Sequence, residues 1–261
     1  MSDTVLVERR GHVAVLTLNR PEAMNSVNQE LATTLGEALE EAQADTEVRA
    51  VVLTGAGERA FCAGMDLKAF ARGESASPIA HPEWGFAGYA RHQISKPTIA
   101  AVNGFALGGG SELVLASDLA VAGRSVKLGF PEVTRGLVAA AGGVLRLQRQ
   151  IPQKFALEAV LTGEPIPAER AAELGLVNRV VDDGTVVDAA LALAERIAQN
   201  APLAVQASKS FLYRAADFGS DWNDDVWQAH DDAVMPVFAT EDALEGARAF
   251  AEKRPPEWKG R

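Results

Sequence analysis

The chain has 261 residues, of which 48% are hydrophobic and 23% charged, and it carries a formal net charge of −10. This composition is that of an ordinary globular protein, and the length fits one large domain with at most a small appendage. The acidic charge argues against a general nucleic-acid binder, which needs clustered Lys and Arg, but permits a small anionic ligand held by local basic groups.

The cysteine content and the hydropathy also limit the class of protein. The single cysteine, Cys62, excludes an intrachain disulfide and a Cys-rich zinc site. The first ten residues contain no apolar segment typical of a signal peptide. The longest uncharged stretch, residues 97–111, is too short to cross a membrane as a helix. We therefore expect a cytoplasmic protein that does not span a membrane.

Strand and helix signals alternate in the first part of the chain. β-rich or apolar runs predict four strands, at residues 13–18, 49–54, 98–102 and 118–122. Asn28 is a suitable N-cap for a helix that places Leu31, Leu35 and Leu39 on one face. Gly, Ser and Pro residues indicate a loop over 73–85. This alternation predicts an α/β fold with crossover connections.

Helical patterns dominate the rest of the chain, which begins at residue 142. A strand-like run at 177–181 interrupts them. A final helix is predicted over 238–253 and ends before Pro255. We place a boundary near residue 200, which gives two parts, residues 1–200 and 201–261.

Several local motifs give only weak support for chemistry. The run Gly55-Ala56-Gly57 follows a strand but lacks the helix start and the acidic residue of a dinucleotide site. Ser111 does not fit a nucleophile elbow, because Leu113 stands where that motif needs glycine. The four histidines have no metal-ligand spacing, so no metal is expected. Cys62 lacks an evident activating base and is better interpreted as a buried apolar residue.

Two turns of small residues, at 60–67 and 103–113, are more informative together. Each follows a buried strand and precedes a helix, which leaves backbone N–H groups free at the helix start. Two such turns aimed at one point can stabilise an oxyanion, although each alone is also typical of a simple connection. Glu112 and Glu132 both lie near a predicted helix start, where a glutamate can merely complement the helix dipole.

These segments carry a resemblance to a known family. Residues 62–67, 101–113 and 130–132, in this order, resemble the crotonase (enoyl-CoA hydratase/isomerase) family, and the likeness extends from Leu18 to Arg254. Within the family the chain looks most like the carnitinyl-CoA dehydratase (crotonobetainyl-CoA hydratase) branch. The features shared with that branch are at residues 55–58, 66–69, 142–147 and 258–261.

The resemblance implies a crotonase-like spiral of ββα turns with a helical C-terminal trimerisation region, in a homotrimer or hexamer. It implies that the N–H groups of Met65 and Gly109 form an oxyanion hole for a thioester carbonyl. Glu112 and Glu132 match the catalytic glutamates of hydratases. The positions it assigns to substrate binding are Ala23, Met24, Ser26, Ala63, Asp66, Leu67, Gly108, Pro131, Phe250 and Lys253. Coenzyme A is part of the acyl-CoA substrate, so no separate cofactor is implied.

Hydration of an enoyl thioester needs an activated water at Cβ and a proton at Cα. We assign the first task to Glu112 and the second to Glu132. The sequence departs from the family at residues 139–143, where Ala-Ala-Ala-Gly-Gly replaces the usual Pro-Gly-x-Gly-Gly, which disfavours the usual fatty enoyl substrate more than the reaction type. The alternative functions are a single-glutamate enoyl-CoA isomerase and a non-catalytic acyl-CoA-binding protein. The candidates for contact with the CoA phosphates are Arg20, Lys68, Lys253 and Arg254.

Overall fold

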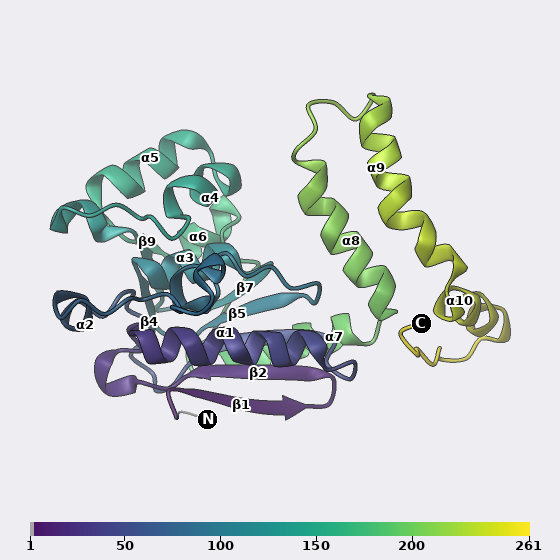
Figure 1. The fold of residues 1–261 in the computed structure, drawn as a ribbon, viewed down its shortest axis with the longest axis horizontal. Coiled ribbons are helices and arrows are strands. Elements are labelled where there is room, and N and C mark those ends of the chain that lie inside the picture. The colour runs from purple at the N-terminus through teal and green to yellow at the C-terminus, as the bar shows by residue number, and fades with distance from the viewer. Residues whose placement is uncertain (1–2) are drawn as a thin grey trace.

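The computed structural model of the protein describes residues 3–261. Its larger sheet has six strands, all parallel to their neighbours except the first pair, and the crossovers between them give an α/β fold (Figure 1). In spatial order its strands are β1 (Val5–Arg10), β2 (Val13–Leu18), β3 (Ala50–Gly55), β5 (Thr98–Val102), β7 (Leu119–Gly123) and β10 (Arg179–Val181).

A second, smaller sheet lies beside the first. Its strands are β4 (Ala60–Cys62), β6 (Phe105–Leu107), β8 (Lys127–Gly129) and β9 (Ile166–Pro167). Each of three successive turns of chain adds one strand to each sheet and then a helix, which closes the expected ββα spiral. The helices of these turns are α2 (Leu67–Ala71), α3 (Gly109–Ala116) and α4 (Gly143–Gln150), the last preceded by the 3₁₀ helix Pro131–Arg135.

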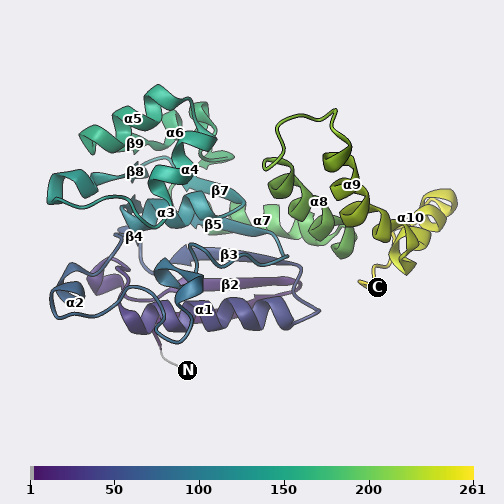
Figure 2. The same cartoon turned by 45° about the horizontal axis from the view of Figure 1, so that its top comes forward.

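The two faces of the larger sheet are covered by different helices, and the strand sequences encode this. Alternate side chains of a strand point to opposite faces. Thus Val13 and Val15 pack toward helix α7 (Val186–Ala198), whereas Leu16 and Leu18 pack toward helix α1 (Gln29–Ala44). Both sets are buried, which explains why these strands read as continuous apolar runs. Figure 2 shows α1 lying along strands β2 and β3.

Helix α1 begins as the sequence predicts. The Asn28 side chain accepts a hydrogen bond from the Leu31 N–H at 3.0 Å, and Leu31, Leu35 and Leu39 are all fully buried. The four predicted strands and the strand-like run at 177–181 are confirmed, with boundaries shifted by at most two residues. Strand β1 was not predicted, because its Glu and Arg residues break the β pattern and its outer edge is exposed.

The remaining helices of the core cover the end of the spiral, and three further helices extend away from it. The core helices are α5 (Gln153–Thr162) and α6 (Ala168–Leu174). We call residues 202–252 the C-terminal arm; its helices are α8 (Pro202–Ala215), α9 (Asp224–Val234) and α10 (Glu241–Glu252). The arm projects from the side of the core opposite α2 (Figures 1 and 2). No helix within residues 3–261 is long and apolar enough to cross a membrane.

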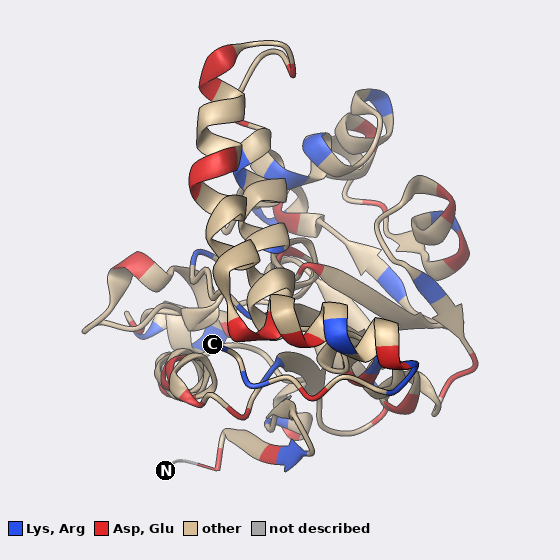
Figure 3. Ribbon diagram, turned by 90° about the vertical axis from the view of Figure 1, so that its right-hand side faces the viewer, with Lys and Arg blue, Asp and Glu red and all other residues tan. Residues whose placement is uncertain are grey.

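One helix boundary in the arm was predicted wrongly. Phe238 lies in a separate 3₁₀ helix, Met235–Ala239, and α10 begins only after Thr240. The Thr240 side chain accepts a hydrogen bond from the Ala243 N–H at 3.1 Å and so fixes the new helix start. In Figure 3 the Lys and Arg residues of the arm are scattered among acidic ones and form no stripe along its described helices.

Candidate active site

The two small-residue turns meet at the junction of the two sheets. Gly64, with φ +87°, lies against the start of helix α3, and a Cβ atom at Gly64 would be 3.0 Å from the Gly109 nitrogen. Gly110 packs against the Cys62 carbonyl so closely that any Cβ would overlap it. The fold thus brings residues 62–65 and 108–110 into backbone contact, which only glycine at these positions permits.

Two N–H groups at this contact are available to a ligand. The Met65 and Gly109 N–H groups have no hydrogen-bond acceptor among residues 3–261. Gly109 is the first residue of α3, where the N–H lacks an intrahelical partner and the helix dipole favours negative charge. The pair therefore has the donor arrangement of an oxyanion hole.

The Met65 turn is held on its other side by the segment after strand β2. The Ala63 N–H donates to the Met24 carbonyl at 3.0 Å and the Asp66 N–H donates to Val27 at 2.9 Å. The Arg20 guanidinium donates to the Asp66 carboxylate at 3.0 Å, and this half-buried pair lies directly beside Met65. These contacts fix the position of the Met65 N–H.

Glu112 lies one turn into α3 and is 3% exposed. Its Oε1 accepts a hydrogen bond from the Gly143 N–H at 2.8 Å, and the Ala141 N–H also stabilises its charge. Burial, with a smaller contribution from the nearby charge of Glu132, raises the pKa of Glu112 from 4.5 to about 7. A carboxyl with this pKa can exchange a proton near neutral pH.

Glu132 approaches the same place from the 3₁₀ helix after strand β8. Its Oε1 lies next to Gly108, where a Cβ atom would be 3.2 Å away, and so faces the start of α3. Its Oε2 is buried without a hydrogen-bond partner among the described residues. Burial raises the pKa of Glu132. A buried polar atom without a partner is costly, and a ligand or water in the site would satisfy it.

The two glutamates form a coupled pair beside the two free N–H groups. Because burial raises both pKa values and the two charges repel, the pair retains one proton at a pH where an isolated glutamate has lost it. One carboxylate and one carboxylic acid can then act on the same water and the same carbon skeleton. The local sequence indicated each glutamate only as a first-turn residue, and the family resemblance alone pointed to a catalytic role. Their proximity is a result of the fold.

Some residues that shape the site were missed at the sequence level. The Phe86 ring packs against the Cα of Gly109, so that a Cβ there would overlap the ring. Phe86 lies in the 3₁₀ helix Phe86–Gly88, directly after the loop predicted over 73–85. The N–H donors of Ala141 and Gly143 were also missed as Glu112 partners, although the alanine run there was noted.

The structure gathers most of the residues expected to bind substrate, but not all. Met24, Ser26, Ala63, Asp66 and Leu67 lie around the Met65 turn. Ala23 precedes this group, and Gly108 and Pro131 lie beside the glutamates. In contrast, Phe250 and Lys253 lie at the end of the arm, far from α2 in both views (Figures 1 and 2). Within one chain they do not reach the site.

Two of the four cations suggested for phosphate contacts are already engaged. Arg20 pairs with Asp66, and Arg254 pairs with Glu245 at 2.5 Å and Glu252 at 2.6 Å. Lys68 and Lys253 are exposed and form no ion pair within residues 3–261. These two lysines are therefore the better candidates for a phosphate contact.

The other local motifs have structural explanations. The turn after β3 is held by the Asn25 amide, which donates to the Ala56 and Ala60 carbonyls, and by the Asn103 amide, which donates to Gly55 and Gly57. Burial raises the pKa of the Cys62 thiol to about 12, which makes a thiolate nucleophile unfavourable. Within residues 3–261 no group of three His, Cys, Asp or Glu is placed to hold a metal ion.

The raised pKa of Glu112 predicts a pH-dependent cost in stability. Because the folded pKa lies above that of the unfolded chain, the wild type loses stability as pH rises from about 4.5 to about 7, by about 3 kcal/mol. Glu112→Gln lacks this ionisation. Chemical denaturation at pH 4.5 and pH 8 should therefore show the variant gaining stability relative to the wild type at the higher pH. Glu158→Gln, at an exposed position on α5, is the control. An equal difference from the wild type at both pH values would contradict the raised pKa.

Comparison with known proteins places these features in context. The family model for enoyl-CoA hydratase/isomerase matches residues 8–261. The carnitinyl-CoA dehydratase of Proteus mirabilis is 40% identical over the whole of both chains. Among solved structures, an enoyl-CoA hydratase from Mycobacterium tuberculosis H37Rv is 47% identical with a TM-score of 0.93, and a carnitinyl-CoA hydratase from Mycobacterium avium is 57% identical with a TM-score of 0.79; each covers the full chain.

Proposed function

The chain belongs to the enoyl-CoA hydratase/isomerase family, and from this premise we propose that it is a hydratase or dehydratase that adds water to, or removes it from, the Cβ atom of an acyl-CoA thioester. The observation that carries this proposal is the pair of buried, coupled carboxyl groups of Glu112 and Glu132 beside the free N–H groups of Met65 and Gly109. A binding protein without turnover has no use for two buried carboxyls with raised pKa values.

The oxyanion hole acts on the thioester carbonyl. As a nucleophile attacks Cβ, electron density moves through the double bond onto the carbonyl oxygen. The Met65 and Gly109 N–H groups donate to this oxygen, and the helix dipole of α3 adds to the stabilisation. Phe86 excludes water from the side of Gly109, which strengthens these hydrogen bonds.

The glutamates act on the water and on Cα. Glu112, held by two N–H donors and with a pKa near 7, is suited to accept a proton from the attacking water. Glu132 has an unpartnered buried oxygen and a raised pKa, so it can retain a proton and deliver it to Cα. In the reverse direction the same groups eliminate water. This division remains a proposal, because the two carboxyls titrate as a pair.

The presence of both glutamates favours hydration over double-bond isomerisation, which needs only one proton-transfer group. For the acyl group, the full-length similarity to carnitinyl-CoA dehydratases supports a polar four-carbon substrate such as crotonobetainyl-CoA. The test is a panel of enoyl-CoA esters, including crotonyl-CoA and crotonobetainyl-CoA, followed by loss of enoyl absorbance. Thermal stabilisation by all the esters without consumption of any would instead support the binding protein.

We also propose that the protein works as a trimer or hexamer, in which the C-terminal arm packs on a neighbouring copy. Helix α8 buries none of its residues, and the arm exposes large apolar side chains such as Trp222 (91%) and Phe250 (88%). An apolar groove of about 610 Å³ at the base of the arm is lined by Leu119, Ile197, Val205 and Leu212, among others. Monomers rarely expose so much contiguous apolar surface. Assembly of this kind would also bring Phe250 and Lys253 to the substrate groove of another copy. Separately, we propose that the protein is cytoplasmic.

Light scattering at micromolar concentration tests the assembly. We expect a mass of three or six times 27.6 kDa. Replacing the exposed Trp222 and Phe238 with serine should lower the mass and the affinity for CoA thioesters together. Replacing Val138, which is 62% exposed but lies on the core, should not change the mass. A wild-type mass near 27.6 kDa would contradict the proposal.

A further inference from the structure

A single arginine connects the backbone segments that hold the two halves of the site. Residues 139–143 supply the N–H groups that hold Glu112. Residues 86–90 include Phe86, whose ring packs against Gly109. Arg146 donates from Nη1 to the Ala141 carbonyl at 3.3 Å and from Nη2 to the Ala90 carbonyl at 2.6 Å. Its guanidinium therefore joins one carbonyl from each segment, and a Cβ at Gly142 would overlap it.

Arg146 has no dedicated acidic partner among the described residues, and Tyr213 and Glu112 both lie close enough to affect its pKa. Arg146 is half-buried and forms no ion pair within residues 3–261. Burial lowers the pKa of Arg146, and the nearby Tyr213 and Glu112 oppose this effect. The Arg146 charge in turn makes a small contribution that lowers the pKa of Glu112. A half-buried cation that donates only to carbonyl groups is unusual, since buried charged groups in proteins are normally paired.

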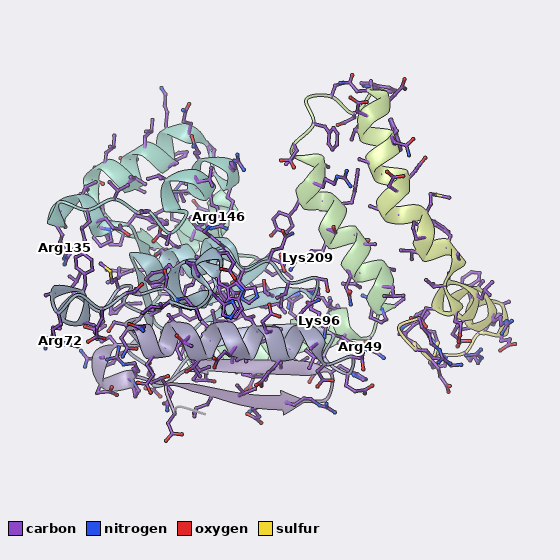
Figure 4. All side chains as sticks on the ribbon, in the orientation of Figure 1. Arg49, Arg72, Lys96, Arg135, Arg146 and Lys209 are labelled. Carbon is purple, nitrogen blue, oxygen red and sulfur yellow. The ribbon has the colours of Figure 1, made fainter. Side chains whose placement is uncertain are left out.

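Other charged and titratable groups also lie around Arg146. On its far side Arg146 lines a cavity of about 470 Å³ between the core and α8, together with Tyr89, Asp118, Lys209 and Tyr213. Figure 4 labels Arg146 on the core and Lys209 on α8. Asp118 is already bound by Lys209 at 2.7 Å and by the Tyr213 hydroxyl at 2.8 Å. His92 pairs with Glu40, and Arg149 is a like charge. Asp217 also lines this cavity, and Tyr213 and Glu112 both raise the pKa of Arg146 against the effect of burial.

We propose that Arg146 is a positioning residue for the reaction: its guanidinium clamps segments 139–143 and 86–90 together, so that the N–H groups of residues 141 and 143 stay on Glu112 and the Phe86 ring stays against Gly109. Arg146 does not contact the reacting atoms in this arrangement. It acts through the N–H groups on Glu112 and through Phe86 on the Gly109 donor. The expected effect of Arg146 on kcat rests on the proposed function. Its expected effect on the pKa of Glu112 does not.

The test compares Arg146→Met with Arg146→Lys in the full-length protein. Arg146→Met loses both the charge and the double donation, so we expect kcat to fall about a hundredfold with a smaller change in KM. The acidic limb of its kcat/KM profile should move to higher pH, because removal of the cation raises the pKa of Glu112. Arg146→Lys keeps the charge but loses the planar fork, so its acidic limb should stay near that of the wild type while kcat is reduced.

Arg149→Met is the matched control, since Arg149 is exposed on the same helix and should leave kcat and the pH profile unchanged. Carbon-13 NMR titration of Glu112 in the unliganded protein provides a second measurement that needs no activity. If Arg146→Met keeps the wild-type kcat and acidic limb, the inference is wrong and the proposed function stands. If the wild type turns over no enoyl thioester, the proposed function fails, and an unchanged Glu112 titration in Arg146→Met would overturn the inference separately. Where Arg146→Met does not fold, a wild-type kcat in Arg146→Lys contradicts the clamp.

Discussion

Glu112→Gln and Glu132→Gln are each expected to lower kcat for hydration by at least a hundredfold while the protein folds normally. Removal of a general acid or base costs about this much or more. Glutamine has the shape of glutamate, so the hydrogen bond from the Gly143 N–H to residue 112 can be kept. Neither variant can pass a proton between the carboxyl group and the water or Cα.

The two variants should lose activity to a comparable extent, and the double variant should be little worse than either, because the carboxyls act as a unit. Binding of a CoA thioester, measured by thermal shift, should persist in both. Glu164→Gln, on an exposed loop before strand β9, is the matched control and should be fully active. Retention of near wild-type kcat by both active-site variants would exclude the two-glutamate mechanism. Activity lost in only one of them would support the isomerase.

Gly110→Ala is expected to lower kcat by a similar factor, because it displaces the backbone of the site. The added Cβ would overlap the Cys62 carbonyl, and neither segment can move away, because Phe61 and Cys62 are fully buried. The turn that carries Met65 must therefore shift relative to Gly109. Loss of one oxyanion donor costs about a hundredfold to a thousandfold in kcat.

The measurement is kcat on the substrate that the wild type turns over, together with Tm. Gly219→Ala is the control, since no atom lies within 4 Å of a Cβ at that position in the arm, and its φ is not positive. Wild-type kcat in Gly110→Ala would show that the contact between the two turns does not set the donor geometry. A folded Gly110→Ala protein that binds CoA thioesters but fails to hydrate them would be the clearest support.

The long elements could be predicted from the sequence because each carries its own signal. Strands β2 and β3 are continuous apolar runs, and α1 has both an N-cap and a leucine face. The three-residue strands β4, β6 and β8 could not be predicted, since so short a segment is defined by the strand beside it. Strand β1 has charged residues along an exposed edge, and only its pairing with β2 makes it a strand.

The candidate site was only partly accessible to sequence reasoning. The glycines at 64 and 108–110 indicate turns with free N–H groups, but not that the two turns touch. The distance in sequence between Glu112 and Glu132 gives no sign that they share a charge environment. The proposed role of Arg146 could not be predicted, because its two carbonyl partners, Ala90 and Ala141, lie on different segments that only the fold brings together. Raised pKa values and unpartnered atoms are properties of the folded chain.

The most direct test of this account is the fate of the oxygen atom of water. The wild-type protein should convert an enoyl-CoA ester, in water labelled with oxygen-18, into a 3-hydroxyacyl-CoA that carries the label on Cβ, and Glu112→Gln and Glu132→Gln should form almost none. Mass spectrometry of the product distinguishes this from migration of the double bond, which incorporates no label. Recovery of every enoyl ester unchanged or only isomerised by the wild type, without label, would contradict the proposed hydration.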